Sequence, residues 1–320
     1  MNNSTIDAHI VQCTWNNTAI FGLFVFISGL LTNGTVVLAL LSRHAIWSPF
    51  MVYVFNLFCA NILQSFTGAL LDFINSYCSV WFLGRTLCFV YNYGEWTAAI
   101  LQMLCHPLIA LNRITAIYAP VFYRHTHTYR NAILLCVLTW LLAHIITLPM
   151  LIINTAVDVR DVCHVDLNEP VQKWWAFVLD VVCVLCIGMV AVCFPVVYVK
   201  YRRSRLHSMR VRPIKPDNAS DQSNRLDIGV IGDALSRSQM FLLLLLTIST
   251  LILWTPGNLY ALLSAINLWA DPAAEAIIIP LFAMQAILDP IIFILSLPPL
   301  RMTVRNFFRC NDSAHSQLKI

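Results

Sequence analysis

Seven long apolar stretches are the feature that most limits what this chain can fold into. Each stretch can cross the hydrocarbon core of a bilayer as a helix, which takes about 20 residues. Hydrophobic residues make up 59% of the chain and charged residues only 11%, a combination that a soluble domain of this size does not show. The sequence therefore predicts one all-α membrane domain, a seven-transmembrane helix bundle. The predicted spans are 19–41, 50–73, 87–118, 131–153, 174–201, 240–263 and 273–297.

The basic residues orient this bundle. When the loops are assigned alternately to the two sides, seventeen of the 20 Lys and Arg residues share one side, and the other side holds only Arg85, Arg160 and Lys173. Basic residues accumulate on the cytoplasmic side of spanning helices, so the N-terminus is predicted outside and the C-terminus inside. The bases then face anionic lipid headgroups, which makes membrane lipids, and not nucleic acid, their predicted partners.

Three regions follow from this topology. Residues 1–18 form an extracellular N-terminal tail, 19–297 form the bundle, and 298–320 form a cytoplasmic end. Within the bundle, the third inner loop covers about 202–237 and is the longest connection.

The cytoplasmic end carries an amphipathic pattern. Leu300 and Val304 begin an apolar stripe, while Arg301 and Arg305 lie on another face. Such a pattern predicts a short helix that lies in the membrane interface. Cys310 at its end is a predicted palmitoylation site, with a free cytosolic thiol as the alternative.

The outer side carries cysteines and glycosylation motifs. Cys13, Cys78, Cys88 and Cys163 all fall outside, where disulfides persist, and four cysteines allow three pairings. Six Asn residues begin the Asn-x-Ser/Thr motif, but the topology leaves only those of the outer tail as glycosylation sites. These are Asn2, Asn3 and Asn16.

A set of motifs recurs in or beside the spans. They are Thr32-Asn33-Gly34, the segment 56–61 that ends in Asn61, Trp81-Phe82-Leu83-Gly84, Cys88 with Cys163, Asn112-Arg113-Ile114, Trp140, Leu253-Trp254-Thr255-Pro256, and the segment 289–293 that begins Asp289-Pro290 and ends in Phe293. In this order and spacing they resemble the motifs of the rhodopsin-like (class A) G-protein-coupled receptors, over about residues 19–310. The resemblance implies a Cys88–Cys163 disulfide. It also implies a plasma-membrane receptor, not an enzyme, that binds an extracellular ligand, activates a heterotrimeric G protein and needs no resident cofactor.

Ionisable residues at membrane depth are functional candidates because they are expensive to bury there. Glu95 and Arg113 lie 18 residues apart in the third span, so they share one helix face at a separation of about 27 Å. The position of Glu95, seven residues after Cys88, resembles that of the aspartate that pairs with the ligand ammonium in amine receptors of the family. A Glu95 that is hydrogen-bonded within the bundle remains the alternative.

A ligand pocket is therefore expected around Glu95, with Trp254 as its floor. The fifth span offers no hydroxyl ladder for catechol groups in 181–186, so a peptide or an unusual cationic amine is favoured. The other expected pocket residues are Tyr91, Trp96, Asn258 and Tyr260.

A second candidate site surrounds Asp289. The family often has Asp on the second span and Asn on the seventh, and Asn61 and Asp289 reverse that order. Hard cations take carboxylate and amide oxygens, so a sodium ion held by Asn61, Gln102, Gln285 and Asp289 is one hypothesis. An Asp289 that is hydrogen-bonded and links helices is the other.

The inner end carries the expected switch for G-protein coupling. Pro256 and Pro290 each remove a backbone hydrogen bond, which gives Trp254 a hinge to act on. Asn112 replaces the acid that restrains the neighbouring arginine in many family members, which predicts a weakened restraint on Arg113. Phe293 lacks the tyrosine hydroxyl of the family motif. Both departures keep an alternative open, a receptor-like scavenger or partner subunit that does not couple to G protein.

Other classes of function fit less well. A light-sensing opsin needs a lysine in the seventh span, and 271–297 contains none. A transporter is expected to show internal repeats, and none is evident. No His, Cys and acidic residues cluster with the spacing of a metal centre or a catalytic triad.

Overall fold

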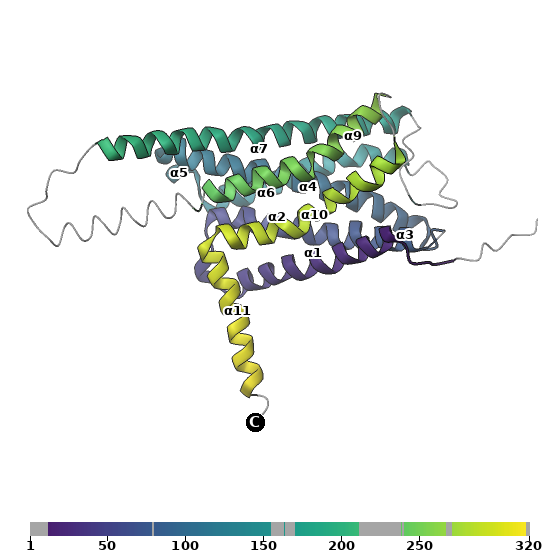
Figure 1. Cartoon of the computed structure of the whole chain (residues 1–320), viewed down its shortest axis with the longest axis horizontal. Helices are drawn as coiled ribbons and strands as arrows, with labels where there is room; N and C mark the ends of the chain where they lie inside the picture. Colours follow the sequence, from purple (N-terminus) through teal and green to yellow (C-terminus); the bar gives the residue numbers. More distant parts are fainter. Residues whose placement is uncertain are drawn as a thin grey trace, which may run out of the picture.

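The computed structural model describes residues 12–78, 80–154, 163, 170–210, 238, 240–266 and 271–317. Helices dominate this part of the chain, and they lie side by side in a bundle (Figure 1). The helices are α1 (Asn17–Leu41), the 3-10 turn η1 (His44–Ile46), α2 (Pro49–Gln64), the π-helical turn η2 (Ser65–Ala69), α3 (Leu70–Tyr77), α4 (Gly84–Tyr118), α5 (Pro120–Thr126), α6 (Tyr129–Asn154), α7 (Pro170–Arg210), α9 (Thr255–Ala265), α10 (Pro272–Ser296) and α11 (Pro298–Gln317).

The spans agree with the predicted seven-helix bundle. Within the described residues, six helical segments are long and apolar enough to cross a membrane, and α10 makes a seventh when it is taken together with α11. The second span combines α2, η2 and α3, and the sixth runs over Met240–Ala265 with a break at Trp254. The fifth differs from the prediction. Since α7 continues to Arg210, the third inner loop begins later than residue 202.

Local sequence explains where the helices begin. The Ser48 side chain accepts a hydrogen bond from the backbone N–H of Met51, and Pro49 occupies the first turn of α2, where its missing N–H costs nothing. The Asn16 side chain caps α1 by accepting from Ala19 N, and its amide also donates to the Ser76 carbonyl oxygen at 2.6 Å. Asn16, predicted as a glycan acceptor, is therefore also a helix cap.

The helix α4 is the centre of the bundle. It packs against α2, α6 and α7, and a continuous apolar core forms around its middle, where Leu101 and Ile109 are fully buried. Both Glu95 and Arg113 belong to α4, so the outer and inner candidate sites are two ends of the same helix.

The π-helical turn η2 lies against the outer half of α4. A Cβ atom added to Gly94 would lie 2.3 Å from the Cβ of Thr67, so the two backbones approach as closely as a glycine allows. One added to Gly68 would meet Glu95 Cγ at 3.7 Å. Turns of this kind are common at functional sites, and here the turn places the second span directly beside Glu95.

The chain turns sharply after α10. The axes of Leu281–Ser296 and Pro298–Arg309 form an angle of 103°, and Figure 1 shows α11 leaving the bundle crosswise. Leu300 and Val304 are buried, whereas Arg301 and Arg305 are exposed. This is the geometry of a helix in the membrane interface. The side chain of Cys310 lies outside the described residues, as do Asn2 and Asn3.

Two disulfides close the outer end. Cys88 at the start of α4 is bonded to Cys163, and Cys13 is bonded to Cys78. The first pair is the one that the resemblance implied, and the second pair joins the remaining two outer cysteines. The Cys13–Cys78 bond ties the N-terminal tail to the end of α3, beside a hydrogen bond from Thr14 N to the Tyr77 carbonyl oxygen at 2.8 Å.

Candidate functional site

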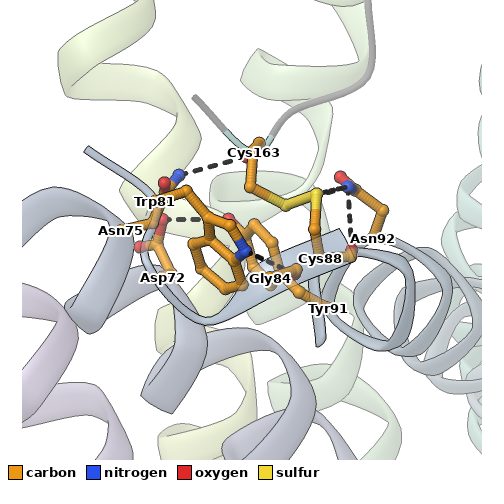
Figure 2. The surroundings of a disulfide bond; sticks show 8 residues. All are labelled: Asp72, Asn75, Trp81, Gly84, Cys88, Tyr91, Asn92 and Cys163. Carbon is orange, nitrogen blue, oxygen red and sulfur yellow. Dashed lines mark hydrogen bonds between the residues drawn. A yellow bond between two sulfur atoms is a disulfide. The ribbon is translucent and has the colours of Figure 1, made fainter. Parts of the chain in front are cut away.

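The outer candidate site lies beneath the Cys88–Cys163 disulfide (Figure 2). The Asn92 amide donates to Cys163 Sγ at 3.3 Å, and the Asn75 amide donates to the Cys163 carbonyl oxygen at 3.2 Å. The Trp81 ring stacks on Tyr91, with ring centroids 5.9 Å apart. Figure 2 shows that these contacts bring α3, the start of α4 and Cys163 together around Tyr91.

Two carboxylates lie beside the Tyr91 side chain. The Tyr91 hydroxyl donates to Asp72 Oδ1 at 3.2 Å, and Glu95 lies one helical turn further along α4, close enough for its charge to act on both groups. Asp72 and Glu95 are both partly buried. Neither forms a salt bridge with any residue that the structure describes. Among the residues that the structure describes, the site thus presents two acids, one hydroxyl and no positive charge.

The other expected pocket residues lie apart from this pair. Trp96 packs against the main apolar core. The Trp254 ring lies 5.2 Å from that of Phe282, and Trp254 is only 3% exposed. The Asn258 amide donates to the Trp254 carbonyl oxygen at 2.8 Å, and Tyr260 OH donates to the Asp271 carbonyl oxygen at 3.1 Å. Asn258 thus bonds within the sixth span and Tyr260 bonds to Asp271. No described contact joins either side chain to Glu95.

A buried polar cluster occupies the middle of the bundle. Asp289 is fully buried, and its Oδ1 atom lies 3.1 Å from His106 Nε2. The Gln285 amide also donates to Oδ1, and the Asn61 amide donates to Oδ2 at 3.3 Å. Asn61 in turn donates to Asn33 Oδ1 at 3.0 Å. This polar core therefore links α1, α2, α4 and α10.

Asn61, Gln285 and Asp289 are joined directly, whereas the Gln102 amide donates to Gln64 and Gln102 meets the cluster through its carbonyl oxygen, at His106 Nδ1. The contacts of Asn61, Gln285 and His106 with Asp289 are the arrangement expected of a hydrogen-bonded aspartate that links helices. Sodium binding stays a prediction. Among the described residues, no group of three or more His, Cys, Asp or Glu side chains could hold a metal ion.

The inner candidate site centres on Asn112. Its amide donates to His127 Nδ1 at 3.1 Å, and its Oδ1 atom accepts from the Tyr123 hydroxyl at 3.4 Å. The rings of Tyr123 and His127 stack with centroids 4.2 Å apart. Burial, and next the charge of Arg113, lower the pKa of His127 from its ordinary value. Burial raises the pKa of Tyr123, while Arg113 and the Asn112 hydrogen bond oppose that rise.

Arg113 lies next to this cluster but bonds differently. Its guanidinium carbon lies 3.2 Å from the centroid of the Phe50 ring, and its Nε atom has no hydrogen-bond partner in the described structure. The side chain is only 7% exposed. It lines a cytoplasmic cavity of about 290 Å³ together with Tyr123 and His127. No described acid pairs with Arg113.

The remaining switch residues lie in the sixth and seventh spans. Pro256 occupies the first turn of α9, directly after the break at Trp254. Pro290 is buried in α10 next to Asp289. Phe293 is fully buried, and its ring meets Phe58 edge-to-face at 5.6 Å. Phe293 therefore serves the apolar core.

Some residues of these sites were missed by sequence reasoning. Asp72 was recognisable as an acid near an outer helix end, but its contact with Tyr91 depends on how two helices are rotated. His106 stood out as an ionisable residue at membrane depth, and its partner lies 183 positions away. Tyr123 and His127 carried no signal beyond their place in a short inner loop.

Comparison with known proteins gives a consistent result. The chain matches the family model "7 transmembrane receptor (rhodopsin family)" over residues 32–293. The human C-C chemokine receptor type 8 is 27% identical over 183 residues, which cover 55% of this chain and 50% of that receptor. The QRFP-like peptide receptor of Branchiostoma floridae is 21% identical over 159 residues, 49% of this chain and 42% of that receptor. The human 12-(S)-hydroxy-5,8,10,14-eicosatetraenoic acid receptor is 28% identical over 139 residues, 42% and 43% of the two chains. The chain spans half or less of the length of these relatives.

Proposed function

Because the chain belongs to the rhodopsin family of seven-transmembrane receptors, we propose that it binds a cationic extracellular ligand, a peptide or an amine, beside Glu95 and activates a heterotrimeric G protein through Arg113. Family membership and the apolar helices make it a multi-pass protein of the plasma membrane, and a receptor rather than an enzyme. Ligand class and coupling are the parts that we propose.

The observation that carries the ligand class is the pair of acids beside Tyr91. Asp72 accepts from the Tyr91 hydroxyl, Glu95 lies one turn further along α4, and neither has a described basic partner. A carboxylate taken partly out of water gains most from an opposite charge that is desolvated with it. A ligand ammonium or guanidinium group supplies that charge, and the fork of a guanidinium suits two nearby acceptors.

The names of the relatives alone leave the ligand class open. They include a chemokine receptor, a peptide receptor and a receptor for a hydroxylated fatty acid. An acidic ligand placed beside Asp72 and Glu95 would meet like charges at close range. The charge of the site therefore favours the peptide or amine over the fatty acid for this chain.

A ligand screen with matched variants tests this proposal. We would apply a library of cationic peptides and amines to cells that express the chain and record cAMP, calcium and inositol phosphate. A true ligand should lose at least about tenfold in potency at Glu95→Gln, because a charge-assisted hydrogen bond contributes about 1.5–3 kcal/mol. Glu95→Asp should retain part of the potency.

Asp180→Asn is the matched control for this screen. Asp180 is also a partly buried acid in a span, on α7, but no described contact joins it to Glu95. Equal potency losses at both positions would show a general charge effect and would count against the site. Ligands whose potency is unchanged by Glu95→Gln would refute the proposed ligand site.

Coupling is tested without a ligand. The basal second-messenger output of the wild type is compared with that of Arg113→Ala at matched surface level. A basal signal that Arg113→Ala abolishes supports G-protein coupling and identifies the pathway.

The second candidate function is a receptor-like scavenger or partner subunit that does not couple. It is favoured by Asn112, which binds Tyr123 and His127, and by Phe293, which is fully buried in the core. Identical output from wild type and Arg113→Ala, with and without a ligand that binds, would support this candidate.

A further inference from the structure

We propose that His106 is the built-in counter-cation of Asp289, and that a proton shared by the two side chains neutralises the core and ties α4 to α10. This role is separate from ligand recognition and from G-protein coupling. It rests on the hydrogen-bonding partners of the two ring nitrogens, on burial, and on a set of amide oxygens that have no partner.

The partners of the imidazole ring fix where the protons lie. His106 Nδ1 lies 2.8 Å from the Gln102 carbonyl oxygen, which can only accept, so Nδ1 must carry a hydrogen. His106 Nε2 lies 3.1 Å from Asp289 Oδ1 and 3.3 Å from Gln285 Nε2, and the Gln285 amide donates to the same Oδ1 atom. Two acceptors cannot bond to each other without a proton between them, so a second proton lies between Nε2 and Oδ1. The pair therefore carries no net charge.

Burial makes this proton necessary. His106 is 2% exposed and Asp289 is fully buried. The other groups that face the carboxylate are the amides of Asn61 and Gln285, which donate hydrogen bonds but carry no charge. Removing one partner of a buried ion pair leaves an uncompensated charge and is strongly destabilising, whereas replacing both partners by uncharged groups costs far less.

The same geometry makes the proton on His106 and a bound metal cation mutually exclusive. Three amide oxygens of this cluster have no hydrogen-bond partner in the described structure: Asn61 Oδ1, Gln102 Oε1 and Gln285 Oε1. Together with a free Asp289 carboxylate they are the ligand types that a hard cation prefers. While His106 holds the shared proton, however, an added sodium ion would leave an unbalanced positive charge in the core. Sodium and the His106 proton are thus alternatives, and in the wild type the proton occupies the site.

The contact between His106 and Asp289 affects how the two helices are held. The helix α4 carries Glu95 at its outer end and Arg113 at its inner end, with His106 between them, and α10 carries Asp289. A bond between the two helices at this depth fixes how α4 lies against the seventh span. His106 is in this sense a positioning residue.

The test measures the thermal stability of the purified full chain in lipid nanodiscs. Midpoint temperatures are recorded in sodium chloride and in N-methyl-D-glucamine chloride at equal ionic strength, for the wild type, His106→Leu, Asp289→Asn and the double variant. The wild type should show no sodium-specific shift. In the glucamine salt, His106→Leu should lose on the order of 10 °C, and sodium should restore at least half of that loss.

The remaining variants separate this role from a merely structural one. Asp289→Asn should be destabilised without any sodium response, and the double variant should be more stable than His106→Leu alone in the glucamine salt. His144→Leu is the matched control, since His144 also loses a hydrogen bond, to the Tyr93 hydroxyl. It should be destabilised but indifferent to sodium.

Three results would overturn the proposal. A sodium-specific stabilisation of the wild type, absent in Asp289→Asn, would show that sodium itself occupies the site, and this measurement needs no His106 variant to fold. A His106→Leu protein that sodium does not stabilise, or a double variant no more stable than His106→Leu, would show that His106 and Asp289 are not coupled by charge.

Discussion

At the scale of single residues, Gly94 has a strict steric requirement. Its hydrogen faces Thr67, and an added Cβ atom would lie 2.3 Å from Thr67 Cβ and 2.7 Å from Thr67 Cγ2. Gly94→Ala must therefore push η2 away from α4, and overpacking of this kind costs about 1–3 kcal/mol. We expect a lower midpoint temperature for the purified protein and a weaker response to any ligand that depends on Glu95.

Gly34→Ala is the control for that prediction. Gly34 also lies within a helix, α1, but no atom lies within 4 Å of an added Cβ. Alanine favours the helix over glycine by about 0.5–1 kcal/mol, so this variant should be as stable as the wild type or slightly more stable. Equal effects of the two substitutions would contradict the close approach of η2 and α4.

The restraint on Arg113 gives a second prediction at this scale. Asn112→Asp would place a carboxylate next to a guanidinium that now rests on Phe50 without a described acidic partner. If the missing acid weakens the inactive state, basal second-messenger output should fall about two- to fivefold in Asn112→Asp, as an ion pair of up to about 1 kcal/mol allows. Asn112→Ser, which adds no charge, should not lower it. Equal basal activity in wild type and Asn112→Asp would refute the hypothesis.

The residue scale also shows what the sequence alone could reveal of the sites. Glu95, Arg113 and Asp289 were recognisable because ionisable residues within apolar spans are rare and costly. Tyr91 was predicted beside Glu95 because it lies one turn away on the same helix. The contacts of His106 with Asp289 and of Phe50 with Arg113 were not predicted, because they depend on the rotation of one helix against another. Periodicity along a single span does not determine that rotation.

At the scale of elements, the short helix α5 and the residue after it carry a pH-dependent contact. Asn112 donates to His127 Nδ1, so the contact needs a neutral imidazole with Nδ1 free to accept. The pKa of His127 is lowered in the fold, by burial first and by Arg113 second. The contact is therefore fully present above the ordinary histidine value of about 6.5, and it is lost as the pH falls through the lower folded value.

Hydrogen exchange of residues 120–127, corrected for the intrinsic effect of pH, measures this loss. Amide protection should fall about two- to fivefold on acidification, because one partly exposed hydrogen bond contributes up to about 1 kcal/mol. His127→Phe should remove the pH response, while His125→Phe, at an exposed position of the same helix, should keep it. A response that persists in His127→Phe would assign it to another group.

Elements were predictable in their number and order but less so at their ends. The length of the apolar stretches located the spans. The structure adds that Pro49, Pro120 and Pro298 all lie in first turns. The extension of α7 to Arg210 was not predicted, because its last turns are basic and leave the apolar span. The turn η2 was not predicted either, because a single π-helical turn depends on packing against α4.

At the scale of the whole molecule, one helix connects two sites of opposite charge. The acids Asp72 and Glu95 lie toward the outer face, where the two disulfides are, and Arg113 lies at the cytoplasmic cavity. The bundle therefore has an acidic ligand end and a basic effector end about 27 Å apart on α4. The positive-inside distribution that oriented the chain could be predicted from the sequence because it depends only on loop charges.

This arrangement predicts that substitutions at the two ends of α4 impair different functions, ligand response at one end and signalling output at the other. Glu95→Gln should lower the potency of a cationic ligand found by the screen at least about tenfold while leaving basal output at the wild-type level. Arg113→Ala should abolish basal and ligand-driven output, yet ligand affinity in membranes should stay within about tenfold, because coupling between sites is typically only about 1–3 kcal/mol. Binding is measured with the labelled ligand and output with second messengers, at matched surface expression. Arg113→Ala cells that still signal, or Glu95→Gln cells that lose basal output together with the ligand response, would show that the two ends are not separate sites joined by α4.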